Sequence, residues 1–149
     1  MTSRYNVAIL GASGLVGQRL QELLYDHPLF DVVAIAGSPN SVGLMHEEIE
    51  WRLDSRRPNY DILICSMSDI PDVDIAFSAL PNNVAEVVEP SLVARGIHVF
   101  SNASAFRRIA GIPLVIPEVN PEDMRSYYGH ACATNCTVVP VVTPIIGLK

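Results

Sequence analysis

The sequence has 149 residues, of which 49% are hydrophobic and 17% charged, and its formal net charge is −6. A chain of this length and composition can bury the core of one domain, which excludes an intrinsically disordered protein. Ten basic residues against sixteen acidic ones, with no long basic run, exclude nucleic acid and an anionic membrane as the main partner.

No apolar stretch approaches the roughly 20 residues of a membrane-spanning helix. The amino terminus passes from a short polar start into a glycine-rich loop, without a signal-peptide cleavage site. Three cysteines are an odd number, and disulfides are rare in the cytosol, so free thiols are expected. These features predict a cytoplasmic protein.

Short apolar segments alternate with helical patterns in the first part of the chain. Residues 5–10 predict a buried strand, and residues 31–36 predict a second one. Between them, residues 15–25 predict a helix. We expect this helix to bury one apolar stripe, formed by Leu15, Val16, Leu20, Leu23 and Leu24.

The remaining chain continues this alternation after an irregular stretch. A helix is predicted over residues 84–94 and ends before Gly96, and another could start at Cys136, with Pro140 and Pro144 interrupting its hydrogen bonds. Further strands are predicted at 62–65, 74–78, 97–100, 114–116 and 130–133. Strands separated by helices are typical of a parallel sheet, so we predict a Rossmann-like, doubly wound α/β fold with helices on both faces.

The glycine-rich loop GASGLVG occupies residues 11–17, between the first strand and the first helix. Glycine permits a tight turn and leaves room for a phosphate to approach the backbone. The helix amino terminus then offers N–H groups to a pyrophosphate, and the Ser13 hydroxyl can donate to a phosphate oxygen. The alternative is a strand-to-helix turn that binds no ligand.

The end of the second strand indicates which dinucleotide is bound. An NAD site places Asp or Glu about 20 residues after the glycine loop, where it binds the ribose 2′-hydroxyl. Residues 37–41 read GSPNS and contain no carboxylate. Small hydroxyl and amide donors suit a 2′-phosphate, so NADP is favoured. The alternative is a polar surface turn.

Cys136 lies in the segment ATNC, after a predicted strand and at the possible start of a helix. A cysteine at a helix amino terminus is more readily held as the nucleophilic thiolate, and the Asn135 amide could stabilise an oxyanion. The alternative is a small buried side chain, which is the interpretation for Cys65 and Cys132. The spacing of Cys132 and Cys136 lacks partner ligands, so we predict no metal site.

Several motifs occur together in one order and cover nearly the whole chain. The sequence resembles the aspartate-semialdehyde dehydrogenase family, in particular the amino-terminal part of its archaeal and fungal branch. The segments that carry the resemblance are VAILGASGLVGQRL (7–20), DHPLFDVVAIAGSPNSVG (26–43), DVDIAFSALP (72–81), VFSNASAFR (99–107), PLVIPEVNPE (113–122) and TNCT (134–137).

The resemblance implies reversible, NADPH-dependent reduction of aspartyl phosphate to aspartate semialdehyde, in the synthesis of lysine, threonine and methionine. It implies that Cys136 is the nucleophile and that Arg107 binds the substrate phosphate. The implied cofactor residues are Gly11, Ser13, Gly14, Leu15 and Val16 at the pyrophosphate, Ser38 and Ser41 near the 2′-phosphate, Ser78, Ala79, Leu80 and Pro81 beside the nicotinamide, and Asn102 near the cofactor or phosphate.

The chain departs from the family at the cysteine, where the usual N-P-N-C is replaced by Ala133-Thr134-Asn135-Cys136. We expect residues 1–149 to form an NAD(P)-binding domain that ends just after the catalytic cysteine. The resemblance implies a second domain, outside this sequence, with the acid–base histidine and the interface of a homo-oligomer. The chain alone is expected to bind NADP without turnover.

Two alternatives remain open. One is a related reductase acting on N-acetylglutamyl phosphate or malonyl-CoA, and the other is a nucleotide-binding module without catalysis.

Overall fold

The computed structural model describes residues 4–147, and the chain forms two compact units, Met1–Ala79 and Leu80–Lys149. Each unit contributes three parallel strands. In the part of the chain that is described, no helix is both long enough and apolar enough to cross a bilayer. The prediction of one cofactor-binding domain over residues 1–149 stays a prediction.

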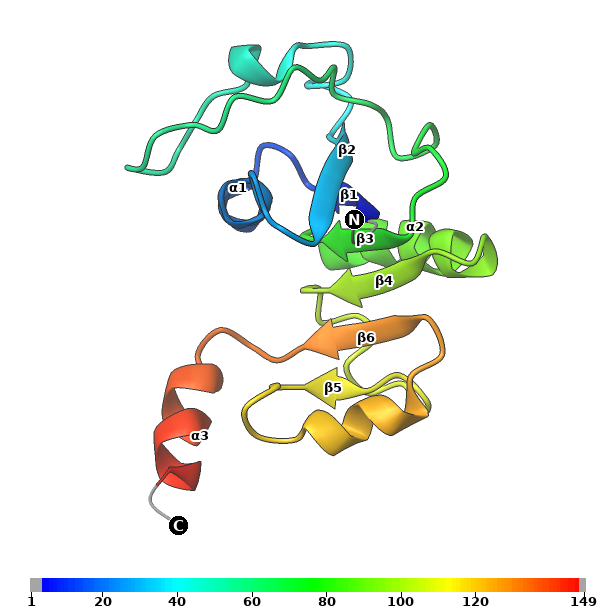
Figure 1. The fold of residues 1–149 in the computed structure, drawn as a ribbon. Coiled ribbons are helices and arrows are strands. Elements are labelled where there is room, and N and C mark those ends of the chain that lie inside the picture. The colour runs from blue at the N-terminus through cyan, green and yellow to red at the C-terminus, as the bar shows by residue number, and fades with distance from the viewer. Residues whose placement is uncertain (1–3, 148–149) are drawn as a thin grey trace. The chain divides into compact units, whose positions relative to one another are not determined.

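The sheet of the first unit has β1 (Tyr5–Leu10) at its centre (Figure 1). β1 runs parallel to β2 (Phe30–Ala36) on one side and to β3 (Ile75–Ser78) on the other. Residues 7–10 of β1 are each 0% exposed. A central parallel strand is covered on both faces, which explains why its sequence is continuously apolar rather than alternating. The predicted strands at 5–10 and 31–36 are confirmed.

Helix α1 (Leu15–Leu24) follows β1 and packs against β1 and β2. The predicted apolar stripe is wrong at three of its five positions, because Leu15, Val16 and Leu23 are 57%, 46% and 63% exposed, whereas Leu20 packs against the core. Leu24 is buried as expected. The buried face of the helix contains Gly17, Gln18, Gln21 and Leu24. The side chains of Gln18 and Gln21 therefore lie on the buried face of the helix, which the sequence pattern predicted to be apolar.

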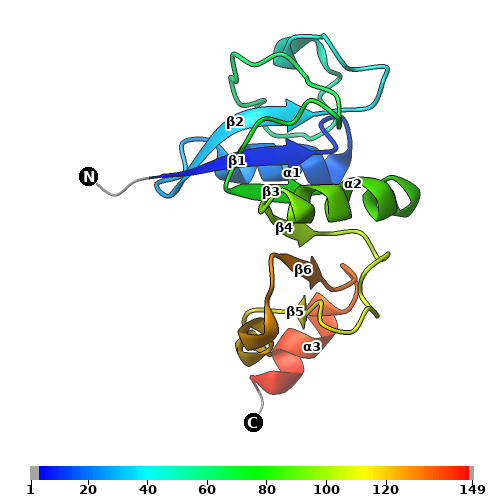
Figure 2. The same cartoon turned by 90° about the vertical axis from the view of Figure 1, so that its right-hand side faces the viewer.

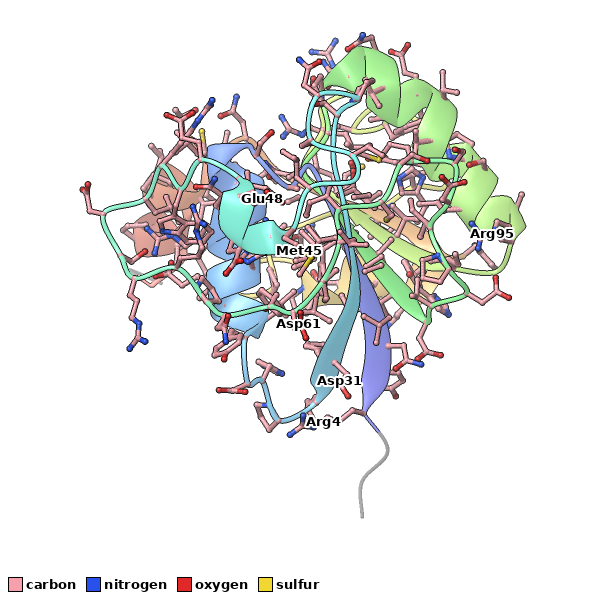
Figure 3. All side chains as sticks on the ribbon, turned by 90° about the horizontal axis from the view of Figure 1, so that it is seen from above. Arg4, Asp31, Met45, Glu48, Asp61 and Arg95 are labelled. Atoms are coloured by element: carbon pink, nitrogen blue, oxygen red, sulfur yellow. The ribbon has the colours of Figure 1, made fainter. Side chains whose placement is uncertain are left out.

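The segment between β2 and β3 is mostly irregular and contains the short 3₁₀ helix η1 (His46–Glu48). The backbone N–H of Met45 donates to the Glu48 carboxylate at 2.6 Å, and both residues lie at this helix in Figure 3. The strand predicted at 62–65 is wrong. Its residues form only isolated bridges, from Leu63 to Met45 and from Cys65 to Ala36 at the end of β2.

The second unit has β6 (His130–Ala133) between β4 (His98–Ser101) and β5 (Leu114–Val115), all parallel (Figure 2). Helix α2 (Asn82–Ala94) packs against β4, and the 3₁₀ helix η2 (Pro121–Ser126) lies beside β5. Gly96, just after α2, has a φ of 81°, a left-handed conformation that glycine adopts without strain.

The last helix, α3 (Val139–Ile146), begins at Val139 rather than at Cys136. Pro140 lies in its first turn, where an N–H group would lack an intrahelical partner in any case. Cys136 therefore lies in the turn that precedes the helix. The α/β class is confirmed, since both units combine parallel strands with helices.

Candidate functional site

The glycine loop is fixed by close backbone contacts within the first unit. Gly11 has a φ of 99°, and a Cβ atom there would lie 2.7 Å from the carbonyl oxygen of Ala79. A Cβ atom on Gly17 would overlap the carbonyl oxygen of Gly11. The N–H groups of Gly11 and Ala12 both donate to the Ala36 carbonyl oxygen, at 3.0 Å. The packing of the chain itself thus requires glycine at residues 11 and 17.

Gly14 has no such explanation in the packing of the chain. Its φ of −80° suits any residue, and the nearest atom to an added Cβ is the Gly11 carbonyl oxygen, 3.6 Å away. Gly14 is exposed and caps α1, and no described side chain bonds to this helix end. The first turn contains no acidic residue. An exposed helix amino terminus that no described side chain caps fits an anionic group such as a pyrophosphate.

The turn after β2 holds the two serines predicted to lie near a 2′-phosphate. Ser38 is exposed, whereas Ser41 is 6% exposed and donates its hydroxyl to the Ser38 carbonyl oxygen at 3.0 Å. A Cβ atom on Gly37 would overlap the Ser41 hydroxyl oxygen, so Gly37 allows this turn to close. Only Ser38 of the pair therefore presents its side chain to solvent.

The residues predicted to lie beside a nicotinamide follow one another along the chain. Ser78 ends β3 and is 1% exposed, and the Ala79 N–H donates to the Leu10 carbonyl oxygen at 2.9 Å. Leu80 is buried, and the exposed Pro81 precedes the first residue of α2.

Arg107 ties the loop after β4 to the segment that leads to the cysteine. Its Nε atom donates to the carbonyl oxygen of Ala133 at 3.0 Å. Its Nη2 atom donates to the carbonyl oxygens of Asn102, at 2.9 Å, and of Thr134, at 3.4 Å. The fixed fork of a guanidinium suits such a set of acceptors. The structure thus brings Arg107, Asn102 and the cysteine segment together.

Cys136 is exposed, and its thiol lies 3.3 Å from Oδ1 of Asn135. The same oxygen accepts hydrogen bonds from the N–H and the hydroxyl of Thr137, at 3.0 and 3.1 Å. Because Oδ1 makes all three of these contacts, the N–H groups of the Asn135 amide are not used by Cys136 or Thr137. Asn135 therefore shapes the turn and still carries two N–H donors.

The other two thiols lie in surroundings that disfavour a thiolate. Cys132 is 2% exposed, and burial, reinforced by the Glu89 carboxylate, raises its pKa to about 11. Burial also raises the pKa of Cys65. The structural interpretation of these two residues fits their surroundings, and Cys136 is the exposed thiol of the described chain.

A buried polar cluster in the second unit was not predicted. The Glu89 carboxylate accepts a hydrogen bond from the Ser101 hydroxyl at 2.7 Å and lies 2.9 Å from Nε2 of His130. Ser101 in turn accepts a hydrogen bond from the N–H of Ala103 at 3.1 Å. The sequence did indicate that Glu89 is buried, because Ala85, Glu89 and Leu92 have the spacing of residues on one face of a helix.

Comparisons with known proteins agree with this geometry. Residues 6–127 match the family model described as semialdehyde dehydrogenase, NAD binding domain. The aspartate-semialdehyde dehydrogenase of Archaeoglobus fulgidus is 40% identical over 153 residues, covering 93% of this chain and 45% of the relative. That of Aspergillus fumigatus is 34% identical over 157 residues, covering 95% of this chain and 43% of the relative.

A solved structure is also similar over almost the entire chain. It is aspartate semialdehyde dehydrogenase with NADP from Candida albicans, with a TM-score of 0.89 at 31% identity. The similarity covers 98% of this chain and 47% of that one, so the chain spans less than half the length of these relatives. These similarities confirm the resemblance that the motifs predicted, and with it the Rossmann-like fold class.

Proposed function

Because the chain belongs to the semialdehyde dehydrogenase family and contains its NAD-binding domain, we propose that it is the cofactor-binding part of an NADP-dependent aspartate-semialdehyde dehydrogenase. The proposed reaction is the reversible reductive dephosphorylation of aspartyl 4-phosphate to aspartate 4-semialdehyde.

The observation that carries the proposal is the space at Gly14. Gly11 and Gly17 serve the packing of the chain, but Gly14 is exposed, unstrained and without a close neighbour. A side chain is missing there although the fold would accept one, and this fits a ligand that approaches the backbone. We propose that Gly11, Ser13, Gly14, Leu15 and Val16 line the pyrophosphate.

The turn after β2 supports NADP over NAD. Residues 37–41 contain no carboxylate that would bind a ribose 2′-hydroxyl and repel a 2′-phosphate. We propose that the exposed Ser38 contacts the 2′-phosphate, while the buried Ser41 holds the turn through its bond to the Ser38 carbonyl oxygen. The segment from Ser78 to Pro81 is proposed to line the nicotinamide.

The proposed chemistry takes place at Cys136. Its thiolate sulfur adds to the acyl carbon of the substrate, and the carbonyl oxygen takes up the negative charge. When the carbonyl forms again, the bond from the carbon to the phosphate oxygen breaks, which leaves a thioester and releases phosphate. When bound, NADPH supplies the hydride that reduces the thioester carbon. The carbon–sulfur bond then breaks, which yields the aldehyde and restores the thiolate.

Two neighbours assist Cys136 in this proposal. The N–H groups of the Asn135 amide, which are not used in the bonds to Cys136 and Thr137, donate to the oxyanion that forms at the acyl carbon. Arg107 uses Nε and Nη2 on backbone carbonyl oxygens, and we propose that its Nη1 atom contacts the substrate phosphate, close to Asn102. A phosphorylated small molecule and free phosphate are thus the proposed partners of the second unit.

Titration of the purified protein with NADPH and with NADH, followed by nucleotide fluorescence, tests the proposal. We expect saturable binding that is at least about tenfold tighter for NADPH. Equal affinity for both nucleotides would overturn the assignment of NADP, and binding of neither would overturn the cofactor site.

A further inference from the structure

The buried face of α1 carries two glutamines that the proposed function does not use. Gln18 and Gln21 are both 0% exposed, and each uses both ends of its amide. Gln18 donates from Nε2 to the Glu50 carbonyl oxygen at 2.7 Å and accepts at Oε1 from the Arg52 N–H at 2.8 Å. Gln18 thus joins the helix only to the irregular segment after β2.

Gln21 instead connects that segment to the glycine loop. Its Nε2 atom donates to the carbonyl oxygen of Ala12 at 2.9 Å. Its Oε1 atom lies 2.8 Å from Nε2 of His46, which is 2% exposed. Because the amide nitrogen of Gln21 is needed at Ala12, its oxygen faces His46, and the hydrogen between them belongs to the His46 ring.

The surroundings of His46 favour this arrangement. Burial, followed by the charge of Arg57, lowers the pKa of His46, so the ring is neutral and carries a single hydrogen. The Tyr60 hydroxyl also donates to the backbone carbonyl oxygen of Gln21 at 2.7 Å. Both the side chain and the backbone of Gln21 are therefore held by the segment after β2.

The bond to Ala12 fixes the orientation of one peptide of the glycine loop. In a planar trans peptide the C=O and N–H groups point in opposite directions. The Ala12 carbonyl points to Gln21, so the N–H of Ser13, in the same peptide, points away from Gln21. The N–H groups of Gly11 and Ala12 are already bonded to Ala36. Within residues 4–147 the Ser13 N–H has no hydrogen-bond acceptor, so it is the first N–H of the loop that is left for a ligand.

We propose that Gln21, held in place by His46, is a positioning residue for the dinucleotide. It fixes the peptide between Ala12 and Ser13 so that the Ser13 N–H can donate to the pyrophosphate. That the ligand is a dinucleotide is taken from the proposed function. The orientation of the peptide, by contrast, follows from the structure of the protein alone.

Gln18 provides a matched control. It lies on the same helix, is equally buried and makes the same number of side-chain hydrogen bonds, but it does not contact the glycine loop. The variants Gln18→Leu and Gln21→Leu therefore cause similar damage to the packing, and only the second releases the Ala12 carbonyl. Gln21→Glu is a third variant, which keeps the size of the side chain and, when ionised, lacks the donor to Ala12.

NADPH titrations of the three variants, with thermal unfolding as a check on the fold, test the inference. We expect Gln21→Leu and Gln21→Glu to bind NADPH about tenfold more weakly than Gln18→Leu, at comparable melting temperatures. Equal weakening in Gln18→Leu and Gln21→Leu would overturn the positioning role. If Gln21→Leu does not fold, the NADPH affinity of Gln21→Glu is compared with that of Gln18→Leu instead. Equal weakening in these two variants would likewise overturn the positioning role.

Hydrogen exchange without nucleotide separates this inference from the proposed function. Amides of residues 11–14 should exchange faster in Gln21→Leu than in Gln18→Leu, because the loop has lost its buried anchor. Faster exchange supports the inference even if the unmodified protein binds neither nucleotide, a result that would overturn the cofactor site alone. Equal exchange in the two variants would overturn the inference itself.

Discussion

The carboxylate of Glu89 lies 2.9 Å from Nε2 of His130, and the two side chains are 0% and 8% exposed. Glu89 comes from α2 and His130 opens β6, so this contact joins a helix to the central strand of its sheet. The second oxygen of Glu89 bonds to Ser101 at the end of β4. One buried carboxylate therefore links three elements of the second unit.

We expect Glu89→Leu to reduce the free energy of unfolding by about 3–5 kcal/mol, because it leaves polar partners of a buried group without their acceptor. Glu89→Gln keeps the shape and one acceptor, so its loss should be smaller, about 1–3 kcal/mol. Denaturant unfolding of both variants measures the difference. A leucine variant as stable as the unmodified protein would contradict this role of Glu89.

Substitutions in the glycine loop should separate ligand binding from folding. Gly14→Ala meets no atom closer than 3.6 Å and has an ordinary φ, so we expect an unchanged or slightly raised melting temperature. NADPH binding should nevertheless weaken by about tenfold or more, because the methyl group occupies the space of the pyrophosphate. Gly17→Ala should lower the melting temperature, since its Cβ overlaps the Gly11 carbonyl oxygen. Normal NADPH affinity in Gly14→Ala would contradict the proposed site.

His46 should make the protein less stable in mild acid. Its folded-state pKa is below 6.5, first because of burial and then because of Arg57. The unfolded chain binds a proton that the folded protein does not, so stability is complete above about pH 6.5 and falls as the pH drops towards the folded-state pKa. Urea unfolding of His46→Gln between about pH 7.5 and 5 should show a shallower fall than the unmodified protein. Identical slopes would show that His46 does not carry this dependence.

The three thiols should react with iodoacetamide in a fixed order. Cys136 is exposed and should be alkylated first at neutral pH, followed slowly by the half-buried Cys65. Cys132 should react only as the pH approaches its pKa of about 11, or when the protein unfolds. Mass spectrometry of digested samples measures each rate, and Cys136→Ser should lack the fast phase. Labelling of Cys132 as fast as Cys136 would contradict the predicted order.

Much of the fold could be predicted from the sequence because short-range patterns determine it. The apolar runs of β1 and β6 are bounded by glycine or polar residues, and both strands have the predicted limits. The glycine loop could be predicted because backbone geometry restricts residues 11 and 17 to glycine.

The remaining features depend on partners that are distant in sequence. The orientation of α1 follows from bonds that Gln18 and Gln21 make to residues between 12 and 52, and such bonds leave no periodic signal. The apolar periodicity therefore predicted Leu20 and Leu24 correctly but placed Leu15, Val16 and Leu23 on the wrong side of the helix. The contacts of Arg107 with backbone carbonyl oxygens were missed for the same reason, since any residue type supplies a carbonyl.

The bridge at Cys65 also protects the open edge of the sheet in the first unit. The Cys65 N–H donates to the Ile35 carbonyl oxygen at 3.0 Å, and its own carbonyl oxygen accepts from the Gly37 N–H at 3.1 Å. At the other end of β2, the Asp31 carboxylate forms an ion pair with Arg4, with 3.8 Å between Oδ1 of Asp31 and Nη1 of Arg4 (Figure 3). An incoming strand from another molecule would meet an edge that is already paired at one end and charged at the other, which disfavours aggregation by edge-to-edge pairing.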